Sequence, residues 1–365
     1  MLGVILSVTA VSGIAAGLAA LLVIAGRIVS NYGECRIVIN DDKVLKVDGG
    51  SSLLESLTAN EIFIPSACGG KGTCAYCKVR ILDGAGPLLP TEEPYLDTKE
   101  RQDGVRLSCQ VKVKNDLRIE IPAELLEIQQ YTARCSHIRE LTPDIREFRF
   151  ELQDPPEITY TAGQYIQLLA PTYDGNEEVY RAYSISSDPS EKNIIELVIR
   201  LVPNGICTTW CFNYLHENDP VSMNGPYGEF KLSETDAPMI FVAGGSGIAP
   251  IKCILHHMKN TGNSRKAVFY FGANEVQQLF YLDEMRQFEE ELADFTFVPC
   301  VSRPEEEAEW GGEVGLVTDV IERGLPDASG HEAYLCGSPG MIDAAVQVLR
   351  KAGVKEHDIF YDKFA

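Results

Sequence analysis

Four cysteines have the spacing of a metal-cluster site. Cys68, Cys74 and Cys77 lie in one short stretch and Cys109 follows after a gap, which gives the pattern C-x5-C-x2-C-x31-C. Three thiolates in one loop and a fourth from a distance are the ligands typical of a [2Fe–2S] cluster. The loop also holds three glycines, and their lack of a Cβ lets the backbone curl and aim N–H groups at the cluster's sulfur atoms.

Two other kinds of cysteine site compete with this interpretation. A structural zinc usually takes two short Cys/His pairs, whereas the fourth ligand here is solitary. Disulfides need an oxidising compartment. Of eleven cysteines, the seven outside the pattern are odd in number and lack the spacing of a disulfide framework. The cysteine content therefore favours an iron–sulfur cluster in a reducing cytoplasm.

A flavin site is predicted from Arg181-Ala182-Tyr183-Ser184. Arg181 offers a guanidinium fork that matches a diphosphate, Tyr183 can lie along a flavin ring, and Ser184 can hydrogen-bond the ring's polar edge. Downstream, the stretch 205–209 reads as a turn into a helix, where backbone N–H groups and hydroxyls can bind phosphate. The residues expected to bind there are Gly205, Cys207 and Thr208.

A nucleotide site is predicted in the last third of the chain, where strand and helix patterns alternate. The buried strand Met239–Ala243 runs into a glycine turn and a helix expected over Ile251–Lys259. Such a turn lets a pyrophosphate or nicotinamide approach the helix N-terminus, although it is not the usual G-x-G-x-x-G. A second strand, His331–Leu335, ends at a similar turn. The candidate contacts are Gly244, Gly245, Gly247, Cys336 and Gly337.

The amino terminus predicts a membrane anchor. Residues 1–26 carry no charged side chain, and as a helix they would span about 39 Å, enough for a hydrocarbon core of about 30 Å. A signal peptide would have a basic start and a shorter apolar run. Because the basic residues follow the span, we expect a single pass in the inner membrane, the N-terminus outside and the bulk of the chain in the cytoplasm. The net charge of −21 argues against nucleic-acid binding.

The expected architecture is multidomain, α/β and β. A transmembrane helix over 1–29 precedes a β-grasp ferredoxin domain over 33–122, in which Ser51 or Ser52 with Glu55 would begin a helix and Val111–Ile121 would close the sheet. An antiparallel β-barrel for FAD over 131–233 and an α/β domain for NAD(H) over 237–365 complete the chain. The barrel strands are expected at Thr132–Ile138, Ile145–Glu151, Tyr165–Leu169, Ile194–Leu201 and around Val221.

The chain resembles known flavoproteins over nearly its whole length. Arg181–Ser184, Gly244–Pro250 and Cys336–Pro339 resemble motifs of the ferredoxin–NADP reductase superfamily. The order anchor–ferredoxin–flavin–nucleotide and the x5 spacing resemble the family of F subunits of Na⁺-translocating NADH:quinone oxidoreductases. The closing stretch 360–365 resembles that family's ending, in which an aromatic covers the flavin until nicotinamide displaces it; here that residue is Phe364. A shorter flavin domain and Gly-Ser-Pro-Gly-Met at 337–341 depart from the family pattern.

The resemblance implies that NADH gives a hydride to FAD and that single electrons pass through the [2Fe–2S] cluster to integral membrane subunits of a respiratory complex, and finally to quinone. Ser184 would hydrogen-bond the flavin N5, and Cys336 would align the nicotinamide. For NADH against NADPH, Glu275 would repel a 2′-phosphate, whereas Arg303 could bind it. Other acceptors, an oxygenase or a corrinoid protein, and a redox-sensing module without turnover remain alternatives. Glu229 reads as a rim carboxylate rather than a proton shuttle.

Overall fold

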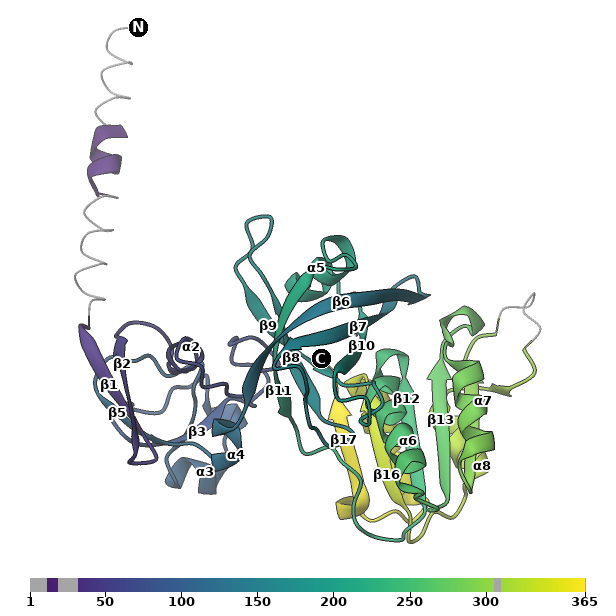
Figure 1. Ribbon diagram of the computed structural model, residues 1–365. Coiled ribbons are helices and arrows are strands. Elements are labelled where there is room, and N and C mark those ends of the chain that lie inside the picture. Colours follow the sequence, from purple (N-terminus) through teal and green to yellow (C-terminus); the bar gives the residue numbers. More distant parts are fainter. Residues whose placement is uncertain (1–11, 19–31, 305–309, 365) are drawn as a thin grey trace, which may run out of the picture. The chain divides into compact units, whose positions relative to one another are not determined.

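The computed structural model describes residues 12–18, 32–304 and 310–364 (Figure 1). Residues 12–18 are helical, and the rest of the predicted anchor lies outside the described residues. Within the described part of the chain, no helix is long and apolar enough to cross a membrane. The chain divides into two compact units, Met1–Ile128 and Gln129–Ala365.

The first unit contains a five-stranded sheet with the order β2-β1-β5-β3-β4, in which β1 and β5 pair in parallel and the other neighbours pair antiparallel. Helix α2 begins at a capping box, because the Ser52 hydroxyl accepts from the Glu55 N–H while the Glu55 carboxylate accepts from the Ser52 N–H. This is the β-grasp arrangement that the sequence predicts. The elements are β1 (Glu34–Ile39), β2 (Lys43–Asp48), α2 (Leu53–Thr58), β3 (Lys78–Asp83), η1 (Glu93–Tyr95), α3 (Thr98–Gln102), β4 (Val105–Leu107), β5 (Leu117–Glu120) and α4 (Ala123–Leu126).

The predicted closing strand Val111–Ile121 is wrong in extent. Strand β5 takes only its last residues, and the earlier part bonds elsewhere: the Val113 N–H donates to the Ser51 carbonyl, and the Leu53 N–H donates to the Val111 carbonyl. The chain after Cys109 therefore lies against the start of α2 rather than within the sheet. This contact holds the residues that follow the fourth cysteine.

The second unit begins with a six-stranded antiparallel sheet, ordered β10-β7-β6-β11-β8-β9. A bridge between Ile185 and Leu197 joins the two ends of this order, so the sheet closes on itself as a barrel. The predicted strands are confirmed, and β9, which was not predicted as a strand, carries the flavin motif. The elements are β6 (Gln129–Thr142), β7 (Ile145–Asp154), β8 (Tyr165–Ala170), β9 (Val179–Ser184), β10 (Ile194–Arg200), α5 (Ile206–Asn213) and β11 (Pro220–Tyr227).

The same unit ends in a parallel six-stranded sheet, ordered β15-β14-β13-β12-β16-β17. The strand order changes direction between β12 and β16, and ligands of open α/β sheets bind at such a point, beyond the carboxyl ends of the strands. The alternating pattern of strands and helices confirms the predicted α/β arrangement. The elements are β12 (Met239–Gly244), η2 (Gly245–Gly247), α6 (Ile248–Thr261), β13 (Ala267–Ala273), η3 (Val276–Gln278), α7 (Leu282–Glu291), β14 (Phe295–Val301), β15 (Glu313–Val314), α8 (Val317–Gly324), β16 (Glu332–Gly337), α9 (Pro339–Lys351), η4 (Glu356–Asp358) and β17 (Ile359–Lys363).

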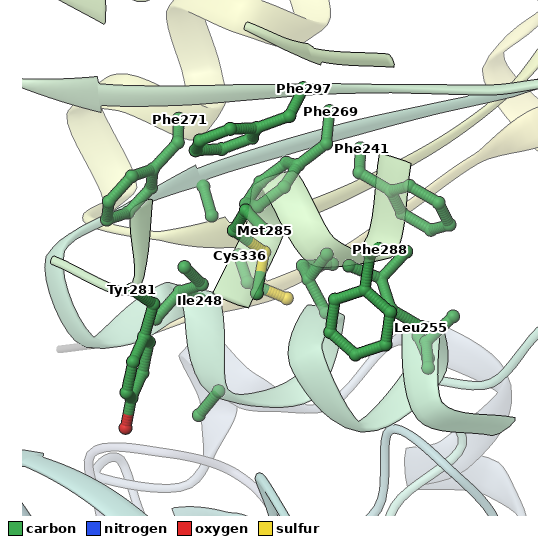
Figure 2. Close-up of a cluster of buried hydrophobic side chains, with 14 of the residues drawn as sticks. Phe241, Ile248, Leu255, Phe269, Phe271, Tyr281, Met285, Phe288, Phe297 and Cys336 are labelled. Atoms are coloured by element: carbon green, nitrogen blue, oxygen red, sulfur yellow. The ribbon is translucent and has the colours of Figure 1, made fainter. Parts of the chain in front are cut away.

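Helices cover both faces of this sheet. On one face α6 and α7 pack over a cluster rich in aromatic side chains, which includes Phe241, Phe269 and Phe271 together with Cys336 (Figure 2). On the other face α8 and α9 bury aliphatic side chains against the alternate positions of the same strands. Strands buried on both faces read as continuous apolar runs, which explains why Met239–Ala243 has no alternation.

Candidate functional site

The four cysteines predicted to hold a cluster lie in two pairs in the first unit. The sulfur atoms of Cys68 and Cys74 are 3.4 Å apart, and those of Cys77 and Cys109 are 3.3 Å apart. Sulfurs at these separations can bind one iron as a pair, and a [2Fe–2S] cluster needs four cysteines on two irons. The three glycines of the loop have φ values of 63° to 83°, the left-handed region that favours glycine. The donor set therefore fits a binuclear cluster.

Each sulfur pair contains one thiol with a lowered pKa. The pKa of Cys68 is lowered above all by a hydrogen bond from the Cys74 thiol, and that of Cys109 above all by one from Cys77. This suits metal binding, because the thiolate is the ligand. Among the described residues, no three His, Cys, Asp or Glu side chains converge as a single metal ion would require.

A buried ion pair supports the strand that leads to Cys109. Glu92 is fully buried and accepts hydrogen bonds from the Arg106 guanidinium, the shortest at 2.6 Å, and from the Leu107 N–H at 2.9 Å. Arg106 also donates to two carbonyls of the preceding loop. A buried carboxylate with several donors fixes local geometry, and the removal of one partner costs about 3–5 kcal/mol. Nothing in the sequence pattern indicated this pair, because Glu92 lies in a loop rich in proline and glutamate.

Strand β9 brings the predicted flavin residues Arg181, Tyr183 and Ser184 to the edge where the barrel closes. Ser184 is buried and lies opposite Tyr165 on β8. Burial raises the pKa of Tyr183 well above its ordinary value, and the Cys207 thiol is a neighbour of its hydroxyl. The structure therefore places the start of α5 beside the Arg-x-Tyr-Ser motif. Tyr183 and Cys207, two predicted flavin contacts from separate stretches of the chain, are therefore neighbours.

The turn before α5 is stabilised by the hydroxyl of Thr208, a residue that was expected to bind phosphate. The Thr208 hydroxyl accepts from the Val202 N–H at 3.2 Å and lies 3.3 Å from the Gly205 carbonyl. A Cβ on Gly205 would lie 2.5 Å from that hydroxyl, so the turn needs glycine there. Thr208 therefore shapes the turn, and the sulfur of the buried Cys207 faces the barrel wall. The backbone at the start of α5 remains the part of the turn that suits a phosphate.

The glycine turn after β12 meets the end of β16. Ala243 pairs with Cys336 across the two strands, and a Cβ on Gly247 would lie 2.3 Å from the Cys336 carbonyl oxygen. Gly245 has a φ of 56°, which lies in the left-handed region that favours glycine. Helix α6 begins at Ile248, three residues earlier than predicted. The five predicted nicotinamide contacts thus lie together where the strand order reverses.

The end of the chain covers this place. Cys336 is fully buried, which raises its pKa well above the ordinary value, and the Phe364 N–H donates to the Gly337 carbonyl at 2.9 Å. Phe364 packs against the apolar cluster that contains Cys336. The predicted aromatic cover is therefore in contact with the predicted nicotinamide residues. Asp362, which the sequence did not single out, pairs with Cys336, and burial raises its pKa to about 6.

Comparisons with known proteins agree with three cofactor sites. Family profiles match a 2Fe-2S iron-sulfur cluster binding domain over residues 37–114, an oxidoreductase FAD-binding domain over 132–232 and an oxidoreductase NAD-binding domain over 241–347. The F subunit of the Na(+)-translocating NADH-quinone reductase of Psychrobacter cryohalolentis is 35% identical, with 98% of each chain covered. That of Neisseria gonorrhoeae is 32% identical, with 99% of each covered. This chain belongs to the family of these F subunits.

Solved structures show how widely this architecture is shared. An Amycolatopsis cytochrome P450 reductase has a TM-score of 0.72 and 27% identity, with 90% of this chain and 98% of that one covered. The ferredoxin reductase of a carbazole 1,9a-dioxygenase has a TM-score of 0.69 and 23% identity, with 91% and 99% covered. The fold that this member of the family of F subunits uses is therefore also that of oxygenase reductases.

A buried lysine joins the two halves of the second unit in this F subunit. Lys252 on α6 is 5% exposed, and its Nζ lies 3.3 Å from Glu147 and 3.2 Å from Glu196 of the barrel. The hydroxyl of Tyr281, whose ring lies in the apolar cluster (Figure 2), donates to Glu147. Glu284 completes the group at 3.8 Å from the ammonium. Sequence reasoning missed the group, although a lysine among the buried apolar residues of α6 was a visible signal.

The ends of β13 and β14 lie together, as a ribose-binding edge would require. The Arg303 N–H donates to the Asn274 carbonyl at 2.8 Å, and the Ser302 hydroxyl lies 3.3 Å from the Asn274 side-chain oxygen. Glu275 follows directly on the same turn. Glu275, which would repel the 2′-phosphate of NADPH, thus lies on the same turn that Arg303, which could bind that phosphate, contacts through its backbone. The F subunits that this chain resembles are named for NADH, for which the carboxylate is the suitable group of the two.

Proposed function

We propose that this chain is the NADH-oxidising subunit of a Na⁺-translocating NADH-quinone reductase. It takes electrons from NADH on FAD and passes them through a [2Fe–2S] cluster to integral membrane subunits, with quinone as the final acceptor. The observation that carries the proposal is the identity of 32–35% with F subunits of this enzyme over almost the full length of both chains. The paired cysteines supply the one-electron site that this route needs.

The bound groups supply the chemistry that splits a two-electron hydride into single electrons. The protein's part is to bind and to orient. Ser184 and Tyr183 would hold the flavin ring and Arg181 its diphosphate, while the backbone at the start of α5 would take phosphate. The cluster would be held by Cys68, Cys74, Cys77 and Cys109.

The nicotinamide would lie between the glycine turn at residues 244–247 and the end of β16. Phe364 would exclude water from this place until nicotinamide takes its position, and the buried thiol of Cys336 would then face the ring. A Cβ on Gly247 would meet backbone atoms of Cys336, so the turn and the strand end lie close together. Their separation would therefore set the position of the nicotinamide. Positioning of this kind contributes much of the rate in hydride transfer.

The proposal places four segments in the chain: an anchor over 1–29, a ferredoxin domain over 33–122, a flavin barrel over 131–233 and a nucleotide domain over 237–365. The anchor would make a single pass through the inner membrane, with the N-terminus outside. Its support is the uncharged stretch of residues 1–26 and the similarity to F subunits along nearly the whole chain. Protease protection in inverted vesicles tests it, because the bulk of the chain should be digested there.

Copurification from detergent-solubilised membranes tests the proposal as a whole. We expect the tagged full chain to bring down integral membrane subunits, and the purified complex to reduce quinone with NADH. A complex that prefers NADPH would overturn the assignment of Glu275. A chain that elutes alone and gives its electrons to a soluble protein would overturn the assignment of the acceptor.

The second candidate is a reductase that feeds an oxygenase. Its support is the TM-score of 0.72 to a cytochrome P450 reductase at 27% identity over nearly the whole of that chain. The identity to the F subunits is higher and covers more of this chain. The same copurification separates the two candidates, since an oxygenase partner would be soluble and would leave quinone unreduced.

A further inference from the structure

One buried hydroxyl beside the cysteine loop lacks a partner. Ser108 is fully buried, and its Oγ has no hydrogen-bond partner among the described residues at ordinary geometry. An unpaired buried hydroxyl destabilises a fold, because the group has lost its hydrogen bonds to water. The residue precedes the predicted ligand Cys109, and its N–H donates to the carbonyl of Cys77 at 2.8 Å. The orphan group therefore lies between two predicted cluster ligands.

The chain leaves little freedom for this side chain to point elsewhere. The Ser108 carbonyl accepts from the Leu54 N–H at 3.1 Å, so both backbone groups of Ser108 are fixed. The Ser108 hydroxyl lies close enough to the Cys77 sulfur to act on it as a donor, although the two do not reach ordinary hydrogen-bond geometry. A thiol sulfur is a weak acceptor, whereas a thiolate bound to iron carries charge and is a strong one.

Gln110, on the other side of Cys109, also offers a side-chain donor to the sulfur of a predicted ligand. The Gln110 amide nitrogen lies 3.6 Å from the Cys109 sulfur and donates to it. A Cβ on Gly72 would lie 2.6 Å from that nitrogen, so the absent side chain at position 72 makes room for the amide. Ser108 and Gln110 thus flank one ligand and supply side-chain donors to the sulfur pair Cys77–Cys109.

We propose that Ser108 and Gln110 set the reduction potential of the cluster by donating hydrogen bonds to the thiolates of Cys77 and Cys109. The inference rests on the assignment of the four cysteines made above. Reduction adds one negative charge to the cluster, and donors to its sulfurs stabilise that charge. They therefore raise the potential and make the cluster a better acceptor of electrons from the flavin.

Replacement of the donors in the full-length, detergent-solubilised protein tests the proposal. Ser108→Ala removes the hydroxyl and Gln110→Leu removes the amide with little change in volume. Each should shift the one-electron equilibrium constant about tenfold toward the oxidised cluster, which lowers the midpoint potential by about 59 mV. The measurement is a redox titration followed by electron paramagnetic resonance. Ser108→Thr keeps the hydroxyl and should hold the potential near that of the wild type.

A matched control separates potential from packing. Ser56 is a buried serine of the same unit whose hydroxyl donates to the Ser52 carbonyl, so Ser56→Ala should leave the potential unchanged. Iron and sulfide content shows whether each variant still holds the cluster. Fully loaded Ser108→Ala and Gln110→Leu proteins with the wild-type potential would overturn the inference. A wild-type protein without iron and sulfide would instead overturn the cysteine assignment on which it rests.

Discussion

The contact between the glycine turn and β16 gives the sharpest prediction about catalysis. A Cβ on Gly247 would lie 2.3 Å from the Cys336 carbonyl oxygen, 2.6 Å from its carbon and 2.9 Å from the Gly337 nitrogen. All three are backbone atoms, so no side chain can swing away. Gly247 has a φ of −62°, which alanine adopts freely, and the effect of Gly247→Ala is therefore one of space alone.

The size of the effect follows from that distance. Ordinary contact of a Cβ begins at 3.4 Å, so the turn and the strand end must part by roughly 1 Å. A misplacement of 1 Å at reacting groups can lower a rate about 100-fold, or about 2.7 kcal/mol in the barrier. We expect Gly247→Ala to lower the rate of flavin bleaching by NADH by about this factor in anaerobic rapid mixing.

The matched control is Gly340→Ala, since a Cβ on Gly340 meets none of the described residues within 4 Å and the residue lies in helix α9. That variant should keep the wild-type rate, and both variants should keep their FAD. If Gly247→Ala with full FAD content accepts electrons from NADH as fast as the wild type, the turn and Cys336 do not position the nicotinamide.

Two further substitutions test charges in the second unit. Lys252→Met leaves Glu147 buried without its cation and leaves Glu196 with Arg149 alone, so the free energy of unfolding in urea should fall by about 3–5 kcal/mol. Asp362→Asn should instead raise the free energy of unfolding at neutral pH. Its pKa of about 6, against 3.8 without burial, means that the native state holds a proton between pH 4 and 6 that the unfolded chain has lost. Stability therefore falls as pH rises through that interval, and Asp362→Asn should be more stable at pH 7.5, by at most about 3 kcal/mol. Neutralisation of Glu147 and Glu196 to glutamine together with Lys252→Met should recover much of the loss, and a triple variant as unstable as the single one would show that the ion pair is not the cause. For Asp362, unfolding curves from pH 4 to 8 provide the test, and parallel pH profiles for the wild type and Asp362→Asn would mean that the carboxyl does not titrate with a raised pKa.

Local signals predicted most elements of the fold. Continuous apolar runs marked the parallel strands, such as Met239–Ala243, and the Ser52–Glu55 pair marked the start of α2. Strand β9 was not predicted as a strand, because its half-buried residues do not alternate cleanly between apolar and polar. The closing strand β17 is only five residues long, and its pairing with β16 depends on a partner distant in the sequence.

The site shows the same division. Cysteine spacing and the Arg-x-Tyr-Ser motif are local patterns, so their residues could be named. The partners of Lys252 lie 105 and 56 residues away, and no pattern along the chain links a buried lysine to Glu147 or Glu196. Burial of Glu92 and Ser108 likewise depends on how loops fold over the sheet. Groups that act through tertiary contacts were therefore the ones that sequence reasoning missed.

Freeze-quench electron paramagnetic resonance after mixing the full chain with NADH tests the central claim most directly. The account predicts that the flavin is reduced first and that a [2Fe–2S] signal then appears, whereas Cys109→Ala keeps flavin reduction and loses the signal. Electron delivery to the membrane partner at the wild-type rate in Cys109→Ala would contradict the account, as would a wild-type chain that shows no such signal.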